Sequence, residues 1–253
     1  MELSDIQGEE TKPSPWGLWT TLGFSCLIIL SYFVCGIFIT AGFVGLTYPP
    51  EAKPDLNQLI SNGLLVTLAV LISSPVIIGL TVFFARLRKG LSLKDYLSFH
   101  EMDWRSILQW SFILLLFAAA SDGLNLLFKR PVVQEFLLNV YLSAPSKPLL
   151  WIALIVASPL SEEVFFRGFL FKGIHHSRLG AAGAILISSL AWAPLHNPYD
   201  LYGMATILAL GLLFGLARLR TNSVYTTIVM HALMNLIAAM EVLVYLGQTS
   251  RSL

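Results

Sequence analysis

The fold is decided by the stretch 148-PLLWIALIVASPLSEEVFFRGFLFKGIH-175, an apolar run interrupted near its middle by Glu162, Glu163 and Arg167. Its length exceeds the ~20 residues that an α-helix needs to cross a bilayer core. On an insertion scale these three charges cost on the order of 8–10 kcal/mol, whereas the Leu, Ile, Val and Phe residues of Leu149–Phe171 return roughly 4–8 kcal/mol. The helix is therefore marginal by itself. Its charges are predicted to face a bundle interior or a wet cavity, where intramembrane charges mark functional sites.

The spacing of the three charges separates their roles. Glu163 and Arg167 are four residues apart, so they share one helix face and are predicted to form an ion pair. Glu162 is turned about 100° away from that face, which leaves its carboxylate as a candidate general base. The alternative is a buried polar knot in which all three side chains only fix the helix register.

Two later segments add polar groups at membrane depth. His196 ends the run AWAPLH, and His231 and Asn235 stand four residues apart, so the latter two share a helix face. Pro159 and Pro194 precede Glu162 and His196 by two or three residues, and each proline removes a backbone hydrogen bond. Irregular backbone in a membrane lines protein interiors or wet cavities. This pattern predicts water beside the carboxylate.

Apolar segments recur along the rest of the chain. No charged residue lies between Lys12 and Glu51 or between Asp55 and Arg86, and each interval is long enough for one span. Further candidate spans are 106–128, 148–175, 180–197, 201–218 and 223–246. The sequence predicts an all-α polytopic transmembrane bundle of about seven spans.

The predicted organisation has three parts. They are a polar N-terminal tail (1–15), N-terminal transmembrane helices (16–140) with an interfacial segment near 89–104, and catalytic helices (148–246). An eighth half-span around 132–144 is an open alternative, which would change the orientation of the later helices.

Composition and charge exclude other classes of protein. Hydrophobic residues make up 56% of the chain and charged residues 12%, which is typical of a multi-pass protein in a lipid bilayer rather than of a soluble domain. The net charge of +1 provides no basic face for nucleic acid. With the N-terminus in the cytoplasm, ten Lys and Arg residues fall on the cytoplasmic side and five on the other. We therefore expect a cytoplasmic N-terminus. The membrane itself is expected to be the plasma membrane of a prokaryote.

Three motifs in this order resemble the CPBP family of intramembrane proteases. They are Glu162-Glu163-x-x-x-Arg167, an aromatic-x-x-x-His motif from Trp192 to His196, and His231-x-x-x-Asn235. The family includes type II CAAX prenyl endopeptidases and the bacterial Abi and lysostaphin-resistance-like proteins. The resemblance covers about 148–240, and the family pattern commonly has Phe at the position of Trp192.

The resemblance implies a helical bundle around a conical cavity and an endopeptidase activity. Glu162 would activate a water that His196 helps to hold, and His231 and Asn235 would stabilise the oxyanion. Glu163 and Arg167 would fix the helix and tune Glu162. The substrate would be a peptide or a prenylated protein.

The metal requirement and the oligomeric state are left open by the residues. We expect no firmly bound cofactor, but Glu162, His196 and His231 could equally form a three-ligand zinc site with an open position. Nothing in the sequence indicates an oligomeric state.

Two non-protease interpretations also stay open. A protease-like site need not be used in every family member, so the chain could be a membrane scaffold or a bacteriocin-immunity factor. Buried Glu, His and Arg also mark ion pathways in transporters. A transporter would be expected to contain paired helix interruptions in two halves of the chain, and the sequence lacks such an internal symmetry.

Overall fold

The computed structural model describes residues 13–101, 103–196 and 200–250. Most of the predicted N-terminal tail, residues 1–12, therefore lies outside the described residues. The elements in chain order are α1 (Leu18–Thr47), α2 (Leu56–Ile60), α3 (Gly63–Arg86), α4 (Leu93–Leu97), α5 (Trp104–Leu127), α6 (Glu135–Ser143), α7 (Lys147–Trp151), the π-helix η1 (Ile152–Ala157), α8 (Ser158–Glu163), the π-helix η2 (Val164–Leu170), α9 (Phe171–His175), α10 (Gly180–Trp192), the 3₁₀-helix η3 (Ala193–His196), α11 (Leu201–Thr221) and α12 (Val224–Thr249).

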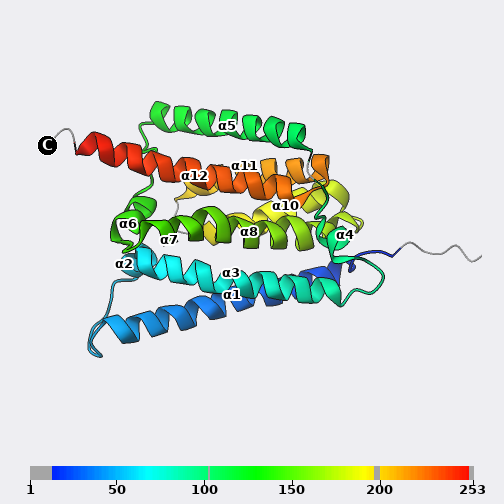
Figure 1. Cartoon of the computed structure of the whole chain (residues 1–253), viewed down its shortest axis with the longest axis horizontal. Helices are drawn as coiled ribbons and strands as arrows, with labels where there is room; N and C mark the ends of the chain where they lie inside the picture. The colour runs from blue at the N-terminus through cyan, green and yellow to red at the C-terminus, as the bar shows by residue number, and fades with distance from the viewer. Residues whose placement is uncertain (1–12, 102, 197–199, 251–253) are drawn as a thin grey trace, which may run out of the picture.

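The long helices lie side by side in one bundle, and α1 begins and α12 ends at opposite ends of it (Figure 1). Within the described residues, six helices are long and apolar enough to cross a membrane, and Gly180–His196 is a shorter apolar helix. The prediction of an all-α bundle with about seven spans is confirmed. Together with the apolar composition, these helices indicate an integral multi-pass membrane protein.

The alternative half-span at 132–144 corresponds to α6, a helix of nine residues. The end of α5 and the beginning of α7 lie at the same end of the bundle, beside α6 and α2 (Figure 1). Val140 of α6 is fully buried, and a Cβ atom on Gly63 would lie 2.7 Å from the Cα of Ala144. The glycine therefore lets α6 pack closely against the beginning of α3, and the chain does not cross the bundle at this point.

The segment 89–104, predicted to lie in the membrane interface, docks onto the end of the bundle. Tyr96 and Leu97 of α4 are fully buried, and the Tyr96 ring stacks on Phe169 with 5.5 Å between centroids. Burial raises the pKa of the Tyr96 hydroxyl to about 12. Arg218 donates a hydrogen bond to Ser98, whose φ of 58° ends α4 in the left-handed region. These contacts fasten the connection between α3 and α5 to α11.

Loop residues fix where the helices begin. The side chain of Asn62 accepts a hydrogen bond from the amide of Leu65 at 3.0 Å, and that of Asp200 accepts one from Gly203 at 2.9 Å. The Gly203 amide and the Arg130 guanidinium together hold the pKa of the Asp200 carboxyl below its usual range. The cap and the Arg130 ion pair therefore anchor the beginning of α11 to the connection between α5 and α6.

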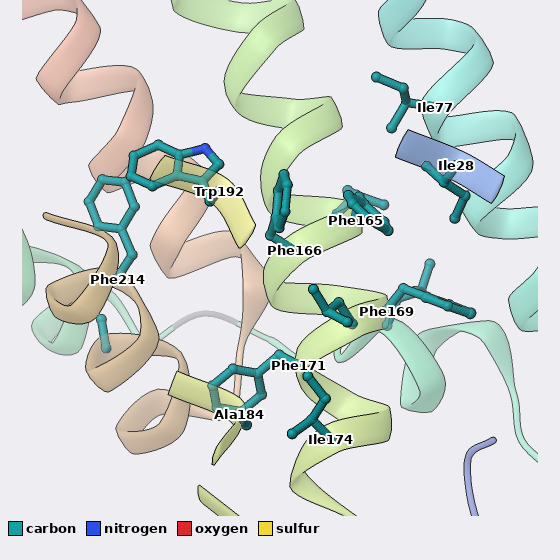
Figure 2. Close-up of a cluster of buried hydrophobic side chains, with 14 of the residues drawn as sticks. Ile28, Ile77, Phe165, Phe166, Phe169, Phe171, Ile174, Ala184, Trp192 and Phe214 are labelled. Carbon is teal, nitrogen blue, oxygen red and sulfur yellow. The ribbon is translucent and has the colours of Figure 1, made fainter. Parts of the chain in front are cut away.

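The core is centred on η2 and α9. Figure 2 shows Phe165, Phe166, Phe169 and Phe171 projecting from this central helix, with Trp192 and Phe214 on one side of it and Ile28 and Ile77 on the other. All of these side chains are buried. The helix that carries the three charges thus lies at the centre of this core.

Candidate functional site

The central helix departs from regular α-helical geometry at the site. Residues Lys147–His175 form one continuous helical segment, but π-helical turns flank α8 on both sides. Pro159 has no N–H, so it cannot bond to the carbonyl of Leu154 in the π register. The side-chain amide of Asn235 on α12 donates to that carbonyl instead, at 2.7 Å. The irregular backbone predicted from Pro159 is present, and Asn235 supplies the hydrogen bond that the Leu154 carbonyl would otherwise lack.

Glu163 is the centre of a buried polar cluster behind the site. Its Oε1 accepts a hydrogen bond from Arg167 Nη1 at 3.0 Å and lies 2.9 Å from Nδ1 of His231. The side chains of Glu163 and Arg167 are both completely buried. The ion pair predicted from the spacing of these two residues is therefore confirmed, and it extends to His231 on α12.

Arg167 is also held by aromatic rings and by a backbone carbonyl. Its guanidinium carbon lies 4.6 Å from the centroid of Trp192 and 5.4 Å from that of Phe214. Its Nη2 donates to the carbonyl of Gly211 at 3.4 Å. Arg167 thus joins the central helix to α10 and α11.

Glu162 faces away from that cluster and receives two hydrogen bonds from neutral donors. Ser158 Oγ donates to its Oε1, and Trp192 Nε1 donates to its Oε2 at 2.5 Å. Neither contact was predicted from the sequence. Ser158 could have been found, because it precedes Glu162 by one helical turn. The signal for Trp192 was weaker: a buried indole N–H usually finds an acceptor.

A cavity of about 440 Å³ adjoins Glu162. Its polar end is lined by Ser158, Ser161, Glu162, His196, His231 and Asn235. The rest of its wall is mostly apolar and comes from α1, α2, α3 and α6, with residues such as Ile28, Leu59, Val70 and Phe136. A carboxylate, two imidazoles and an amide therefore converge at one end of a largely apolar chamber.

The structure brings all six sequence-predicted site residues together in two groups. Glu162, His196, His231 and Asn235 line the cavity, whereas Glu163 and Arg167 lie behind them. The rings of His196 and Trp192 meet edge to face, with 4.7 Å between centroids.

Glu162, His196 and His231 are the side chains that the sequence offers as zinc ligands. Across the described ranges, the His, Cys, Asp and Glu side chains do not form a group of three or more that could hold a metal. As arranged here, Glu162, His196 and His231 do not come together as the three-ligand zinc site that the sequence left open, and the proposed reaction uses no metal.

The chain was compared with known proteins. Residues 144–237 match the family model described as "Type II CAAX prenyl endopeptidase Rce1-like". This segment runs from just before α7 into α12 and contains all six predicted site residues. The comparisons with curated proteins and with solved structures gave no match. The family resemblance predicted from the three motifs is confirmed over the matched segment.

Proposed function

Residues 144–237 match the type II CAAX prenyl endopeptidase family, and from this premise we propose that the protein is an intramembrane endopeptidase in which Glu162 activates water. One observation carries the proposal. The Glu162 carboxylate stands at the polar end of a 440 Å³ cavity beside His196, His231 and Asn235. A carboxylate in this setting has room for a water and for a peptide carbonyl within hydrogen-bond reach.

In the proposed reaction, Glu162 takes a proton from a water molecule that His196 helps to orient. The water oxygen attacks the scissile carbonyl carbon, and the carbonyl electron pair moves to the oxygen as the tetrahedral intermediate forms. When the C–N bond breaks, Glu162 returns the proton to the leaving amine. General-base catalysis of this kind contributes about 10²–10⁴-fold to a rate.

The oxyanion of the intermediate would be stabilised from α12. If Nδ1 of His231 donates to Glu163, Nε2 carries a hydrogen only when the ring is doubly protonated. The proposed oxyanion role of His231 therefore requires the imidazolium form. Asn235 uses one amide hydrogen on the Leu154 carbonyl, so its second hydrogen is the one proposed for the oxyanion.

The apolar part of the cavity supports a lipid-modified substrate. Residues of α1, α2 and α3 extend the wall from Glu162 towards Thr40 and Leu56, and most of them are aliphatic. Such a wall suits a prenyl group or another apolar segment that enters from the bilayer, with the scissile bond held at the polar end. We propose a prenylated CAAX-type C-terminus as the first substrate to test.

The depth of the site also bears on how substrate arrives. Glu162 lies near the middle of the 29-residue helix Lys147–His175, so both aqueous faces are about 20 Å away. The excess of Lys and Arg residues supports a cytoplasmic N-terminus. We propose the plasma membrane of a prokaryote as the location. Accessibility of single introduced cysteines to a membrane-impermeant thiol reagent in intact cells would test this orientation.

The activity is tested with detergent-purified protein and three peptides: a farnesylated CAAX peptide, the same peptide without the farnesyl group, and an unrelated apolar peptide. Mass spectrometry reads the products. We expect the wild type to cleave the farnesylated peptide and Glu162→Gln to be slower by at least about 10²-fold. Glu135→Gln, at an exposed position of α6, should cleave like the wild type.

Other outcomes would change the proposal. A folded wild type that cleaves none of the peptides, or a Glu162→Gln variant that cleaves at the wild-type rate, would contradict it and favour a scaffold or immunity role. Each reaction is repeated after treatment with a chelator. Activity lost on chelation and restored by zinc would contradict the metal-free step.

A further inference from the structure

Trp192 is the largest fully buried side chain of the described residues, and it lies beside the reacting groups rather than in a remote part of the core. Its indole N–H donates to Oε2 of Glu162 at 2.5 Å. In Figure 2 its nitrogen-bearing edge is turned towards the central helix, which carries Glu162. A buried indole N–H that bonds to a carboxylate forms a charge-assisted hydrogen bond, which is stronger than one between neutral groups.

The remaining faces and edges of the indole are occupied by other residues of the site. The His196 ring meets it edge to face at 4.7 Å and the His231 ring at 5.4 Å, both between centroids. The Arg167 guanidinium lies over it at 4.6 Å. One side chain therefore touches groups from the central helix, η3 and α12.

On the side that faces α11, the indole ring packs against Gly211. A Cβ atom on Gly211 would lie 3.1 Å from Cε3 of Trp192 and 3.1 Å from Cβ of Ser189. Because Gly211 has no side chain, α11 can pack directly against the indole ring. This packing leaves the ring little room to tilt. The indole N–H is thus aimed at Glu162 by packing on several sides.

Both carboxylate oxygens of Glu162 are held by this arrangement. Ser158 donates to Oε1 from the same helix, and Trp192 donates to Oε2 from a different one. Each carboxylate oxygen accepts more than one hydrogen bond, so both can still meet a water. A phenyl ring would fill much of the same space but would leave Oε2 without this donor.

We propose that Trp192 is a positioning residue for the general base: its indole N–H fixes the rotamer of Glu162 so that the carboxylate faces the attacking water. This inference rests on the proposed function. It predicts that removal of the N–H alone slows the chemical step and leaves substrate binding nearly unchanged, because Trp192 is not among the residues that line the cavity.

The test compares two replacements of Trp192 that keep an aromatic ring. Trp192→Phe removes the N–H and some volume, whereas incorporation of 3-benzothienylalanine replaces only the N–H with sulfur and keeps the bicyclic shape. We expect both to lower kcat by at least about tenfold, with KM changed by less than about twofold. Trp16→Phe is the matched control, because it also removes an indole hydrogen bond, to the Phe84 carbonyl at 2.9 Å, at a distance from the site. It should leave both constants unchanged.

A spectroscopic readout tests the hydrogen bond without reference to activity. The indole ¹H–¹⁵N signal of Trp192 is assigned by its absence in Trp192→Phe. We expect this signal to shift in Glu162→Gln, while the Trp16 signal stays in place. A signal that does not respond to Glu162→Gln would overturn the inference.

The activity outcomes separate this inference from the proposed function. If the wild type cleaves, Glu162→Gln does not, and the benzothienyl variant keeps the wild-type kcat, the inference is overturned and the proposed function stands. If KM rises and kcat is unchanged, Trp192 acts on binding and the inference is again overturned. If a folded wild type cleaves nothing, the proposed function fails and the inference fails with it.

Discussion

The first helix and the central helix are nearly equal in length but differ in where they lie in the bundle. α1 has 30 residues and Lys147–His175 has 29. The most apolar window of α1 has a mean hydropathy of 2.4 and is 11% buried, whereas that of the central helix has 1.7 and is 44% buried. The more apolar helix is therefore the less buried one.

The difference in burial between the two helices follows from the lipid that surrounds the bundle. Lipid tails are as apolar as leucine side chains, so burying apolar surface against another helix brings little hydrophobic gain in a membrane. Charged groups are costly in lipid and must be enclosed by protein. The buried residues of α1 are Thr21, Ser25 and Ile28, so even this helix uses small polar residues where it meets its neighbours. Polar groups, more than hydropathy, determine the centre of this bundle.

The largest predicted effect comes from breaking the buried ion pair of the central helix. Arg167→Met should destabilise the protein by about 3–5 kcal/mol, because it takes from the buried Glu163 carboxylate the guanidinium that bonds to it. Unfolding in detergent micelles, followed by circular dichroism, measures the change. The double variant Arg167→Met with Glu163→Gln should recover part of the loss. An equal loss in both variants would mean that packing around Arg167, rather than the uncompensated charge, sets the cost.

A smaller effect is expected at Asn235, whose side chain on α12 donates a hydrogen bond to the Leu154 carbonyl of the central helix. Asn235→Ala should destabilise by about 1–3 kcal/mol in the same assay, because the Leu154 carbonyl would lose its donor inside the protein. Asn139→Ala on α6 is the matched control, since Asn139 is exposed. Its effect should stay within about 0.5 kcal/mol. An Asn235→Ala variant as stable as the control would show that this carbonyl does not need Asn235.

Two glycines, one of them with the smallest expected effect, test how α1 meets the central segment. A Cβ atom on Gly173 would lie 2.7 Å from Cβ of Thr21, a distance that side-chain rotation cannot relieve. Gly173→Ala should therefore destabilise by about 1–3 kcal/mol. A Cβ on Gly42, towards the exposed end of α1, would meet no atom within 4 Å. Gly42→Ala should stabilise by about 0.5–1 kcal/mol through helix propensity. Equal effects at the two glycines would contradict the difference between these regions.

The sequence was sufficient for the spans and for the grouping of the six site residues. Long uncharged intervals predict membrane helices because the bilayer sets their length, and the four-residue spacing of Glu163 and Arg167 predicts their ion pair. The family match over 144–237 agrees with the three motifs.

The sequence was not sufficient for the contacts that join different helices. The bond from Trp192 to Glu162 depends on how α10 sits against α8, and the bond from Asn235 to Leu154 depends on the π-helical turn before Pro159. Neither is a local property of the chain. Tertiary packing likewise buries Tyr96 and Leu97 completely, and the local pattern of 89–104 does not predict that burial.

The central claim is that two adjacent carboxylates have different tasks: Glu162 carries the chemistry and Glu163 holds the structure. The most direct measurement determines, side by side, the cleavage rate of the farnesylated CAAX peptide and the free energy of unfolding for Glu162→Gln and Glu163→Gln. We predict that Glu162→Gln loses at least about 10²-fold in rate and stays within about 1 kcal/mol of wild-type stability, whereas Glu163→Gln loses about 3–5 kcal/mol of stability. A Glu162→Gln variant that cleaves at the wild-type rate, or two variants with the same profile, would contradict this account.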